Sequence, residues 1–238
     1  MHTILILNAR VSMILTQTPQ FDVQDDLSLG DGIAPIPQWF DPQTISRDHI
    51  PSGFFNLELD PSISDVFLRL HHLFRVSHEH KLSTTDLHDL TCYVLHKLLA
   101  WSPDISQPGL SNLIATSQCI RYAVALYMLI IHGPTYFSHA HLQSSLATEL
   151  KRNIRSLLPI FAIAHGPVAL WVLTVGVAAS QDALTSGWFT AKAMTVAREL
   201  ELHTWDDILQ CMEGVLWYKT QRGEEQFRQR WEEALNII

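Results

Sequence analysis

The stretch SLLPIFAIAHGPVALWVLTVGVAASQ, residues 156–181, contains no charged side chain and decides which fold the chain can adopt. Its first half holds Pro159 and the run His165-Gly166-Pro167, which are residue types that end or interrupt helices, so we expect two shorter elements. A helix from Pro167 to Ala179 is too short to cross about 30 Å of hydrocarbon. A helix that is apolar on every side belongs in the centre of a globular core. The stretch therefore predicts a buried central helix rather than a membrane span.

Helix start signals lie on both sides of this central stretch. A serine or threonine followed three residues later by an acidic residue can cap a helix, because each side chain accepts a hydrogen bond from the other's backbone N–H. Three such pairs precede apolar residues at helical spacing. They are Ser62 with Asp65, Ser83 with Asp86, and Thr204 with Asp207.

Helical periodicity covers residues 61–238, and no convincing run of alternating strand residues interrupts it. We therefore predict an all-α body, a multi-helix bundle of about eight helices. The first two capping pairs open two of them. The others are expected at about Asn112 to Ile131, His139 to Leu158, Pro167 to Ala179, Leu184 to Leu200, from Thr204 through Val215 to Trp217, and after Gly223, where the last helix is amphipathic.

The first sixty residues differ in composition from the rest of the chain. Six of the eleven prolines lie within residues 1–61, together with several aspartates. Because such sequence cannot sustain long helices, we predict an extended, mostly irregular N-terminal arm over residues 1–60 and an all-α domain over residues 61–238. The opening run MHTILILNARVSMIL lacks the order of a signal peptide and favours a buried strand or helix stub. The aromatic residues expected to pack the arm onto the body are Trp39, Phe40, Phe54 and Phe55.

Composition and charge exclude several classes of protein. Hydrophobic residues make up 47% of the chain and charged residues 17%, which excludes disorder over the whole length. The formal net charge of −8 disfavours autonomous binding of a phosphate backbone. Cys92, Cys119 and Cys211 are far apart in sequence, so they indicate neither a disulfide framework nor a Cys-rich zinc site. A reducing compartment fits this cysteine usage best.

Thirteen histidines raise the question of a metal site. His88, Cys92 and His96 lie at i, i+4 and i+8, on one face of a predicted helix, and imidazole and thiolate at this spacing could bind zinc with a carboxylate. The alternative is that this stripe flanks the core face, with Cys92 as a small buried hydrophobic residue. We favour the second interpretation, because the sequence marks no partner that completes four-fold coordination.

The pair His88-Asp89 resembles the HD pair of metal-dependent phosphohydrolases, which are also all-α. Those enzymes need an upstream histidine, for which His71 or His72 could serve, and a distant aspartate. A dipeptide is a weak basis for a catalytic site, so the phosphohydrolase is kept as the alternative function.

Other candidate groups have simpler structural interpretations. The cations Lys151, Arg152 and Arg155 could bind an anion, but at the end of a helix they are typical of a solvated face that suits the helix dipole. The runs 78–80 and 139–141, each with two histidines, are interpreted as solvated turn and helix-start residues. No G-x-S-x-G elbow, P-loop, G-x-G-x-x-G or H-E-x-x-H is present. We therefore predict no catalytic residue, no cofactor and no metal ligand, and expect Cys119 to pack inward.

Segments of the C-terminal half occur in an order that resembles the fungal-specific transcription factor domain. That family is the helical regulatory domain usually attached to a binuclear zinc-cluster DNA-binding domain. The match covers about half of the chain well and residues 61–118 loosely. The segments are CIRYAVALYMLI (119–130), LQSSLATELKRNIRSLL (142–158), GPVALWVLTVGVAAS (166–180), SGWFTAKAMTVARELEL (186–202), TWDDILQCMEGVLW (204–217) and FRQRWEEAL (227–235).

Within these segments, four short motifs carry the resemblance. The "WxLxVGxAA"-like helix, the "WF" helix, the "W-[DE]-[DE]" helix start and the "FLW" helix end of the family are matched by Trp171 to Ala179, Trp188-Phe189, Trp205 to Asp207, and Val215 to Trp217. Two departures stand out. Val215 replaces an aromatic residue, and Glu201 stands where the family often has the glycine of a turn.

The resemblance implies a non-enzymatic regulatory and interaction domain of a fungal transcription regulator. Its expected partners are other transcription regulators or a second copy of the chain, with a small-molecule effector as a further route. A zinc cluster needs six closely spaced cysteines, and the first cysteine here is Cys92, so we expect no direct DNA binding by this chain. The family implies a nuclear location, with the cytoplasm as the alternative, and we expect no membrane partner.

Overall fold

The structure is a computed structural model that describes residues 36–40, 54, 57–76, 81–103, 111–133 and 139–235. Over these residues the chain forms one short 3₁₀ helix and eight α-helices and no strand, which confirms the predicted all-α multi-helix bundle. The elements are η1 (Pro37–Phe40), α2 (Pro61–Val76), α3 (Thr84–Ala100), α4 (Ser111–His132), α5 (Ala140–Ala164), α6 (Gly166–Ala179), α7 (Ala183–Glu199), α8 (Trp205–Glu213) and α9 (Gln221–Leu235).

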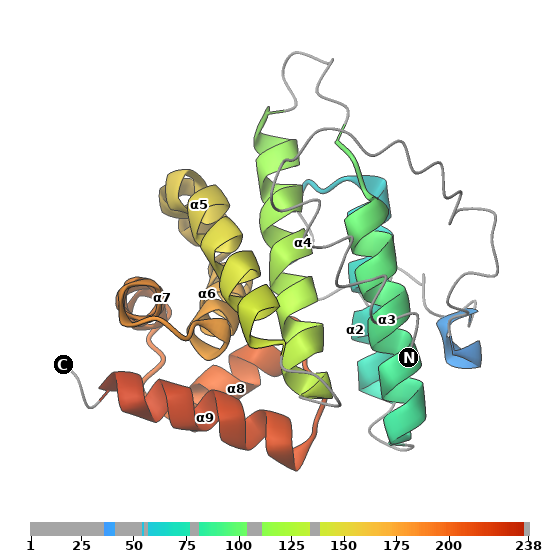
Figure 1. Cartoon of the computed structure of the whole chain (residues 1–238). Helices are drawn as coiled ribbons and strands as arrows, with labels where there is room; N and C mark the ends of the chain where they lie inside the picture. Colours follow the sequence, from blue (N-terminus) through green and yellow to red (C-terminus); the bar gives the residue numbers. More distant parts are fainter. Residues whose placement is uncertain are drawn as a thin grey trace.

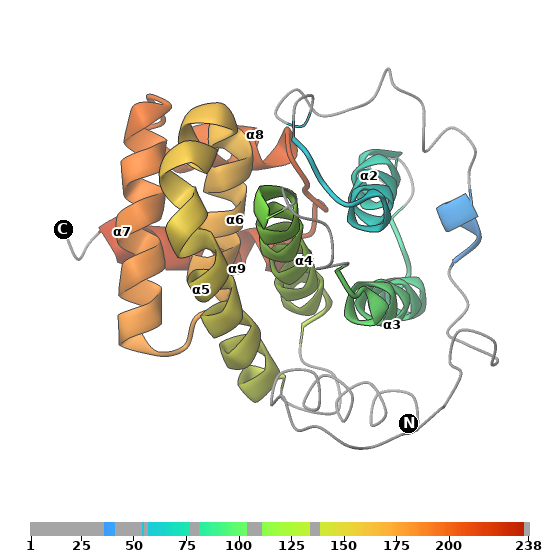
Figure 2. The same ribbon diagram turned by 90° about the horizontal axis from the view of Figure 1, so that it is seen from above.

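The helices form two groups on either side of α4 (Figure 1). Seen from above, α2 and α3 lie together on one side of α4, while α5, α6 and α7 lie on the other side (Figure 2). Helices α8 and α9 run across one end of the bundle, and α9 contacts α4, α6 and α7 (Figure 1). Because α4 and α6 also contact each other, they form the centre of the fold.

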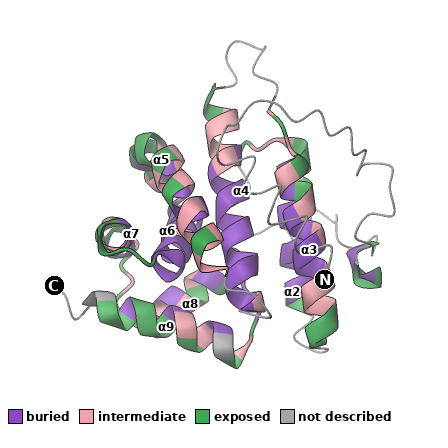
Figure 3. Cartoon of the chain, viewed as in Figure 1, coloured by how far each residue is buried: buried purple, intermediate pink, exposed green. Residues whose placement is uncertain are grey.

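Helix α6 is the buried central helix that the uncharged stretch predicts. Every residue from Val168 to Ala179 is buried, and the helix is surrounded by neighbours in Figure 3. The Trp171 side chain is 0% exposed, and its indole Nε1 donates a hydrogen bond of 2.8 Å to the carbonyl oxygen of Leu216. This bond ties the centre of α6 to the segment that follows α8.

Helix α4 is the longest strongly apolar helix of the described residues. By length and composition alone this helix could cross a membrane. In its most apolar stretch of 18 residues, however, 83% of the residues are buried within the bundle. Apolar helices at the core of folded domains have the same composition. In this structure, α4 has other helices packed on both sides (Figure 2).

An aromatic cluster around Tyr127 of α4 joins the two halves of the bundle. The Tyr127 ring centroid lies 5.7 Å from that of Trp171 and 5.9 Å from that of Phe227 in α9. The Tyr127 hydroxyl accepts a 2.7 Å hydrogen bond from the backbone N–H of Tyr218. Burial raises the pKa of Tyr127 well above its ordinary value, so the hydroxyl stays protonated. The cluster therefore anchors residues 215–220 against α4.

The structure confirms two of the three predicted capping boxes. The Ser83 hydroxyl accepts a 3.0 Å hydrogen bond from the N–H of Asp86, whose carboxylate accepts the Ser83 N–H. Thr204 and Asp207 form the same reciprocal pair at the start of α8. The prediction for α2 is wrong, because Asp60 accepts the N–H of Ser62 at 2.9 Å and Pro61 is the first helical residue. Proline is favoured at that position because its missing N–H has no helical partner there.

Two helix ends differ from the sequence predictions. Pro159 does not divide the stretch, because α5 continues through it to Ala164. The proline removes one helical hydrogen bond, but burial of Phe161 against the core stabilises the last turn. Helix α8 ends at Glu213, so Val215 to Trp217 lie beyond it in a segment held by the hydrogen bonds to Trp171 and Tyr127.

The last helix begins earlier than predicted. Helix α9 starts at Gln221, so that Gly223 lies in its first turn instead of before it. The N–H of Gly223 donates a 3.1 Å hydrogen bond to the hydroxyl of Thr220, which therefore satisfies one of the free donors of that turn.

The predicted N-terminal arm falls largely outside the described residues, including Phe55 and the run MHTILILNARVSMIL. Of its described aromatic residues, Trp39 packs edge-on against Tyr93 at 5.3 Å, and Phe54 stacks on Phe67 of α2 at 4.1 Å. Phe40 is 64% exposed, so its predicted anchoring role is wrong. The division into an arm and a domain stays a prediction.

The turn after α7 requires the left-handed conformation at Glu201, whose φ is 58°. The N–H groups of Leu202 and Glu201 donate to the carbonyls of Ala197 and Arg198, which is a Schellman turn, a helix end that favours glycine. We expect Glu201→Gly to raise the free energy of unfolding by about 1 kcal/mol, because a side chain is strained in this region. Thermal unfolding measures the gain. Glu201→Ala, which keeps a Cβ, should give none, and an equal gain there would contradict the explanation.

Candidate functional site

A histidine cluster joins α3, α4 and the start of α5. The Nδ1 atom of His88 lies 3.0 Å from the Nε2 atom of His132, and the sulfur of Cys92 lies 3.7 Å from the Nε2 atom of His88. The rings of His132 and His139 are 6.3 Å apart between centroids. Burial, and secondarily the charge of His88, lower the pKa of His139, which favours the neutral ring at physiological pH.

This cluster only partly matches the predicted stripe. The structure brings His88 and Cys92 together as the spacing predicts. His88 also contacts His132, which lies 44 positions further along the chain, and nothing in the sequence indicates this second contact. His139 is half-buried and therefore not the solvated residue predicted, although it does flank the start of α5, and His141 is exposed. Among the described residues, no group of three or more His, Cys, Asp or Glu is placed to hold a metal ion.

The alternative phosphohydrolase site has its residues on two helices. His88 and Asp89 lie on α3, and the two candidate upstream histidines, His71 and His72, are buried on α2. The described part of the chain does not gather them into a ligand group. The predicted His78 to His80 turn lies outside the described residues.

The cysteines lack the environment of a nucleophile. Burial raises the pKa of Cys119 to about 12. Burial also raises the pKa of Cys92 and of Cys211 to about 11, and the charge of Asp89 adds to the shift at Cys92. Because the thiolate is the reactive form, all three thiols are protonated and unreactive at neutral pH. Cys119 packs inward as predicted, at 1% exposure.

The cations of α5 do not form an anion site. The ammonium of Lys151 lies 3.4 Å from the carbonyl oxygen of Leu184 and over the Trp188 ring. Arg152 forms an ion pair with Glu149 on its own helix, and Arg155 is exposed. The predicted solvated face is confirmed for Arg152 and Arg155, but the predicted position at a helix end is wrong, because α5 continues to Ala164 and the three cations lie in its middle.

The C-terminal end of α5 carries the most exposed apolar surface near a pocket. Ile160 is 76% exposed and Ile163 is 87% exposed. They are three positions apart, so they lie on the same side of the helix. Ile160 also lines a pocket of about 420 Å³ between α5 and the start of α4. Its apolar wall includes Leu57, Leu113, Leu157 and Phe161.

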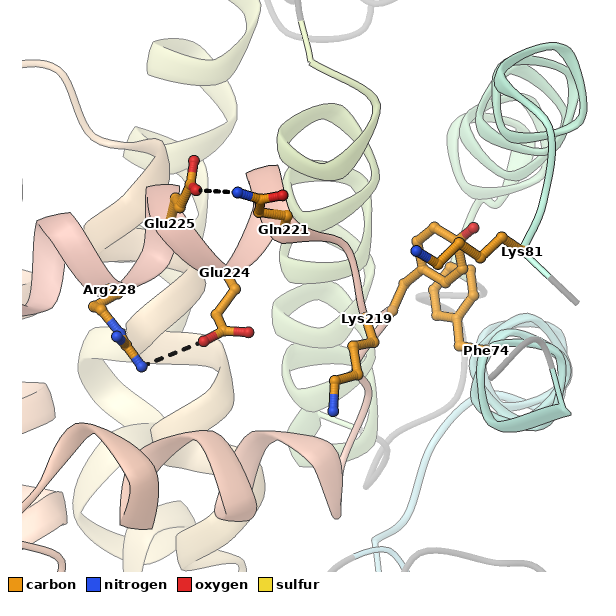
Figure 4. A pocket seen from close by; sticks show the side chains of 8 residues that line it. Phe74, Lys81, Lys219, Gln221, Glu224, Glu225 and Arg228 are labelled. Carbon is orange, nitrogen blue, oxygen red and sulfur yellow. Dashed lines mark hydrogen bonds and ion pairs between the residues drawn. The ribbon is translucent and has the colours of Figure 1, made fainter. Parts of the chain in front are cut away.

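A second pocket, of about 460 Å³, opens between α9 and the end of α2 (Figure 4). Its lining combines buried aromatic rings with charged side chains, whereas the α5 pocket has an apolar wall and polar residues such as Glu58, Asn112 and His165. The lining residues are Phe74, Lys81, Tyr218, Lys219, Gln221, Glu224, Glu225 and Arg228.

Sequence reasoning missed both pockets. The five charged residues of the second pocket lie at position 81 and between positions 219 and 228, on two distant segments that only the fold brings together. Ile160 and Ile163 are indistinguishable from core residues in the sequence, because the pattern does not show which side of a helix end has no neighbour.

Comparison with known proteins gives no relative from which a function could be carried over. We find no protein-family model, no curated protein and no solved structure that matches this chain. The geometry of the described residues and the sequence motifs are therefore the basis for the proposals that follow.

Proposed function

We propose that the chain is a non-enzymatic regulatory and interaction domain of a fungal transcription regulator. It acts through a protein partner, which is another transcription regulator, and a small-molecule effector provides a second route of control. The observation that carries this proposal is the pair of exposed isoleucines, Ile160 and Ile163, beside a pocket whose wall is partly apolar. Exposed apolar surface next to a pocket is typical of a protein interaction site.

The residues that match the motifs of the fungal domain are structural residues in this fold, which supports the proposal. Trp171 and Phe189 are 0% exposed, and Trp217 is 5% exposed. Trp205 and Asp207 open α8, with Asp207 in its capping box. A sequence motif made of core anchors and a helix cap describes a fold rather than an active site.

The charge of the chain supports action through a partner rather than direct DNA binding. The net charge is −8, and the one cluster of cations on α5 is engaged with the protein itself at two of its three positions. Non-specific DNA affinity comes from lysine and arginine side chains that neutralise phosphates, and it falls steeply as the salt concentration rises. The cations of α5 therefore give weak DNA binding at most. A partner that reads DNA supplies the sequence specificity.

Fusion of the chain to an unrelated DNA-binding domain tests the proposal. In a fungal host that carries the matching reporter gene, we expect the fusion to change reporter expression relative to the DNA-binding domain alone. Activation and repression both support a regulatory role, because each requires a partner from the transcription machinery. Reporter expression equal to that of the DNA-binding domain alone, at equal protein level, would overturn the proposal.

A further inference from the structure

The short helix η1 lies on the outer side of the α2–α3 pair, away from α4, where Figure 2 shows it in blue. Within residues 36–40, Ile36 and Trp39 are each 4% exposed, whereas the other three side chains are exposed. The backbone N–H of Trp39 donates a 2.9 Å hydrogen bond to the carbonyl oxygen of Ile36. In a 3₁₀ turn, side chains three positions apart lie on the same side. Two side chains of a single turn therefore hold this segment on the helices.

Trp39 is contacted by an aromatic ring and by an arginine. Its ring lies edge-on to Tyr93 of α3, at 5.3 Å between centroids, and the guanidinium of Arg69 in α2 lies over it at 5.9 Å. The Nη1 atom of Arg69 also donates a 2.8 Å hydrogen bond to the carbonyl oxygen of Trp39. Tryptophan, tyrosine and arginine are the residue types that dominate the binding energy of protein interfaces. The contacts of Trp39 therefore resemble those of a bound peptide with its receptor.

The groups that recognise Trp39 belong to the α2–α3 groove, which we define by Asp65, Val66 and Arg69 of α2 and by Tyr93 and Lys97 of α3. The Nε atom of Arg69 donates to both carboxylate oxygens of Asp65, at 2.9 and 3.0 Å, and this ion pair orients the guanidinium. The ammonium of Lys97 lies over the Tyr93 ring at 5.7 Å. These three are the charged residues that line the groove, and all of them are supplied by the two helices.

Residues 36–40 do not fill the groove. A pocket of about 480 Å³ remains open beside Trp39, and its walls are residues of α2 and α3 together with the side chain of Phe40. Phe40 is 64% exposed, so it leaves this space accessible from solvent. A longer segment could occupy both the position of Trp39 and the open pocket, and it would then bury more apolar surface than residues 36–40 do.

We propose that the α2–α3 groove is a docking site for a short segment of a partner protein, and that residues 36–40 are its internal ligand. The partner segment carries a tryptophan and, three positions before it, an apolar residue, because Trp39 and Ile36 have this arrangement in one turn. It binds by displacing residues 36–40, so docking and release of this segment are coupled. The groove lies on the opposite side of α4 from α5 (Figure 2), so the inference goes beyond the proposed function and does not rest on it.

Release of the internal ligand in the full chain tests the site. The probe is a fluorescently labelled synthetic peptide with the sequence of residues 34–42, and its control has alanine in place of Trp39. We expect the probe to bind saturably to the variant Trp39→Ala, whose groove lacks its own tryptophan. Binding to the wild type should be at least about tenfold weaker, because a tethered ligand competes at a millimolar effective concentration. The control peptide should bind to neither protein.

Two arginine variants identify the contact. Added to Trp39→Ala, Arg69→Gln should weaken probe binding at least about tenfold, because it removes the cation from the indole ring and from the tryptophan carbonyl. Arg155→Gln changes the net charge equally at an exposed position of α5 and should leave the affinity within about twofold. Circular dichroism measures helix content in each variant. Ile36→Asp releases the segment in a second way, because it places a carboxylate at a buried position, so the test does not depend on Trp39→Ala alone.

Four results would each overturn the proposal. They are absence of saturable binding to the folded releasing variants, equal binding to the wild type and to these variants, equal binding of the probe and the control peptide, and equal weakening by the two arginine substitutions. A wild-type dimer that Trp39→Ala converts to a monomer would also overturn it, because the groove would then hold the segment of a second copy. The fusion reporter is a separate measurement, so a silent reporter with intact peptide binding would refute the proposed function and keep the groove.

Discussion

Replacement of Trp171 by alanine is expected to lower the free energy of unfolding by about 3–5 kcal/mol, because it leaves a cavity in the centre of the core. Trp171 is 0% exposed and packs against Phe67 at 5.8 Å and Tyr127 at 5.7 Å between ring centroids. The substitution also removes the indole that donates to the carbonyl of Leu216 and leaves that acceptor unpaired. For a domain of marginal stability, this loss is a large fraction of the total.

Thermal and urea unfolding measure the loss at Trp171. Trp188→Ala is the matched control, because Trp188 is also a tryptophan of the motif series but is only partly buried on α7. We expect the control to be less destabilised by at least about 1.5 kcal/mol. An unchanged melting temperature for Trp171→Ala would show that α6 is peripheral and that the described architecture is wrong.

Gly176→Ala is expected to cost about 2–3 kcal/mol by overpacking the contact between α6 and α7. A methyl group at Gly176 would overlap the ring of Phe189, and Phe189 is itself 0% exposed. The ring has no space into which it can move without displacing its neighbours. The cost therefore exceeds the gain in helix propensity, about 1 kcal/mol, that alanine normally gives over glycine.

Gly187→Ala on α7 is the control for this substitution. No heavy atom lies within 4 Å of the added methyl group, so the variant should gain stability from helix propensity alone. The double variant Gly176→Ala with Phe189→Leu tests the cause, because a smaller side chain relieves the overlap and should recover part of the loss. Stability of Gly176→Ala equal to that of the wild type would contradict the close approach of α6 and α7.

The helices could be predicted from the sequence because their signals are local. Ser83 and Thr204 mark helix starts through hydrogen bonds to residues three positions later, and the uncharged stretch around Trp171 can only be buried. The predictions of helix ends fail where contacts with other parts of the chain determine where a helix begins or ends. Ser62 is not a cap because Asp60 takes that role, and Val215 leaves the helix because the segment around it is held by Trp171 and Tyr127.

The candidate sites could be predicted far less well than the helices. The contact between His88 and His132 joins residues on two helices, and no spacing rule relates them. Lys81 and Lys219 line the same pocket because Tyr218, which precedes Lys219, is fixed by the Tyr127 hydroxyl and by Leu82. Residues of this kind depend on the packing of whole helices, which periodicity along one helix does not specify.

Two variants of the reporter fusion test directly whether the end of α5 binds the partner. We expect Ile160→Glu with Ile163→Glu to reduce the reporter effect at least about tenfold, because carboxylates at the partner surface are desolvated on binding. Leu184→Glu, which alters an equally exposed apolar residue on α7, is expected to leave the effect unchanged. All these positions are exposed, so the fold should be retained in each variant. A full reporter effect in the double variant, or an equal loss in the Leu184 variant, would contradict the claim that the chain regulates transcription through the end of α5.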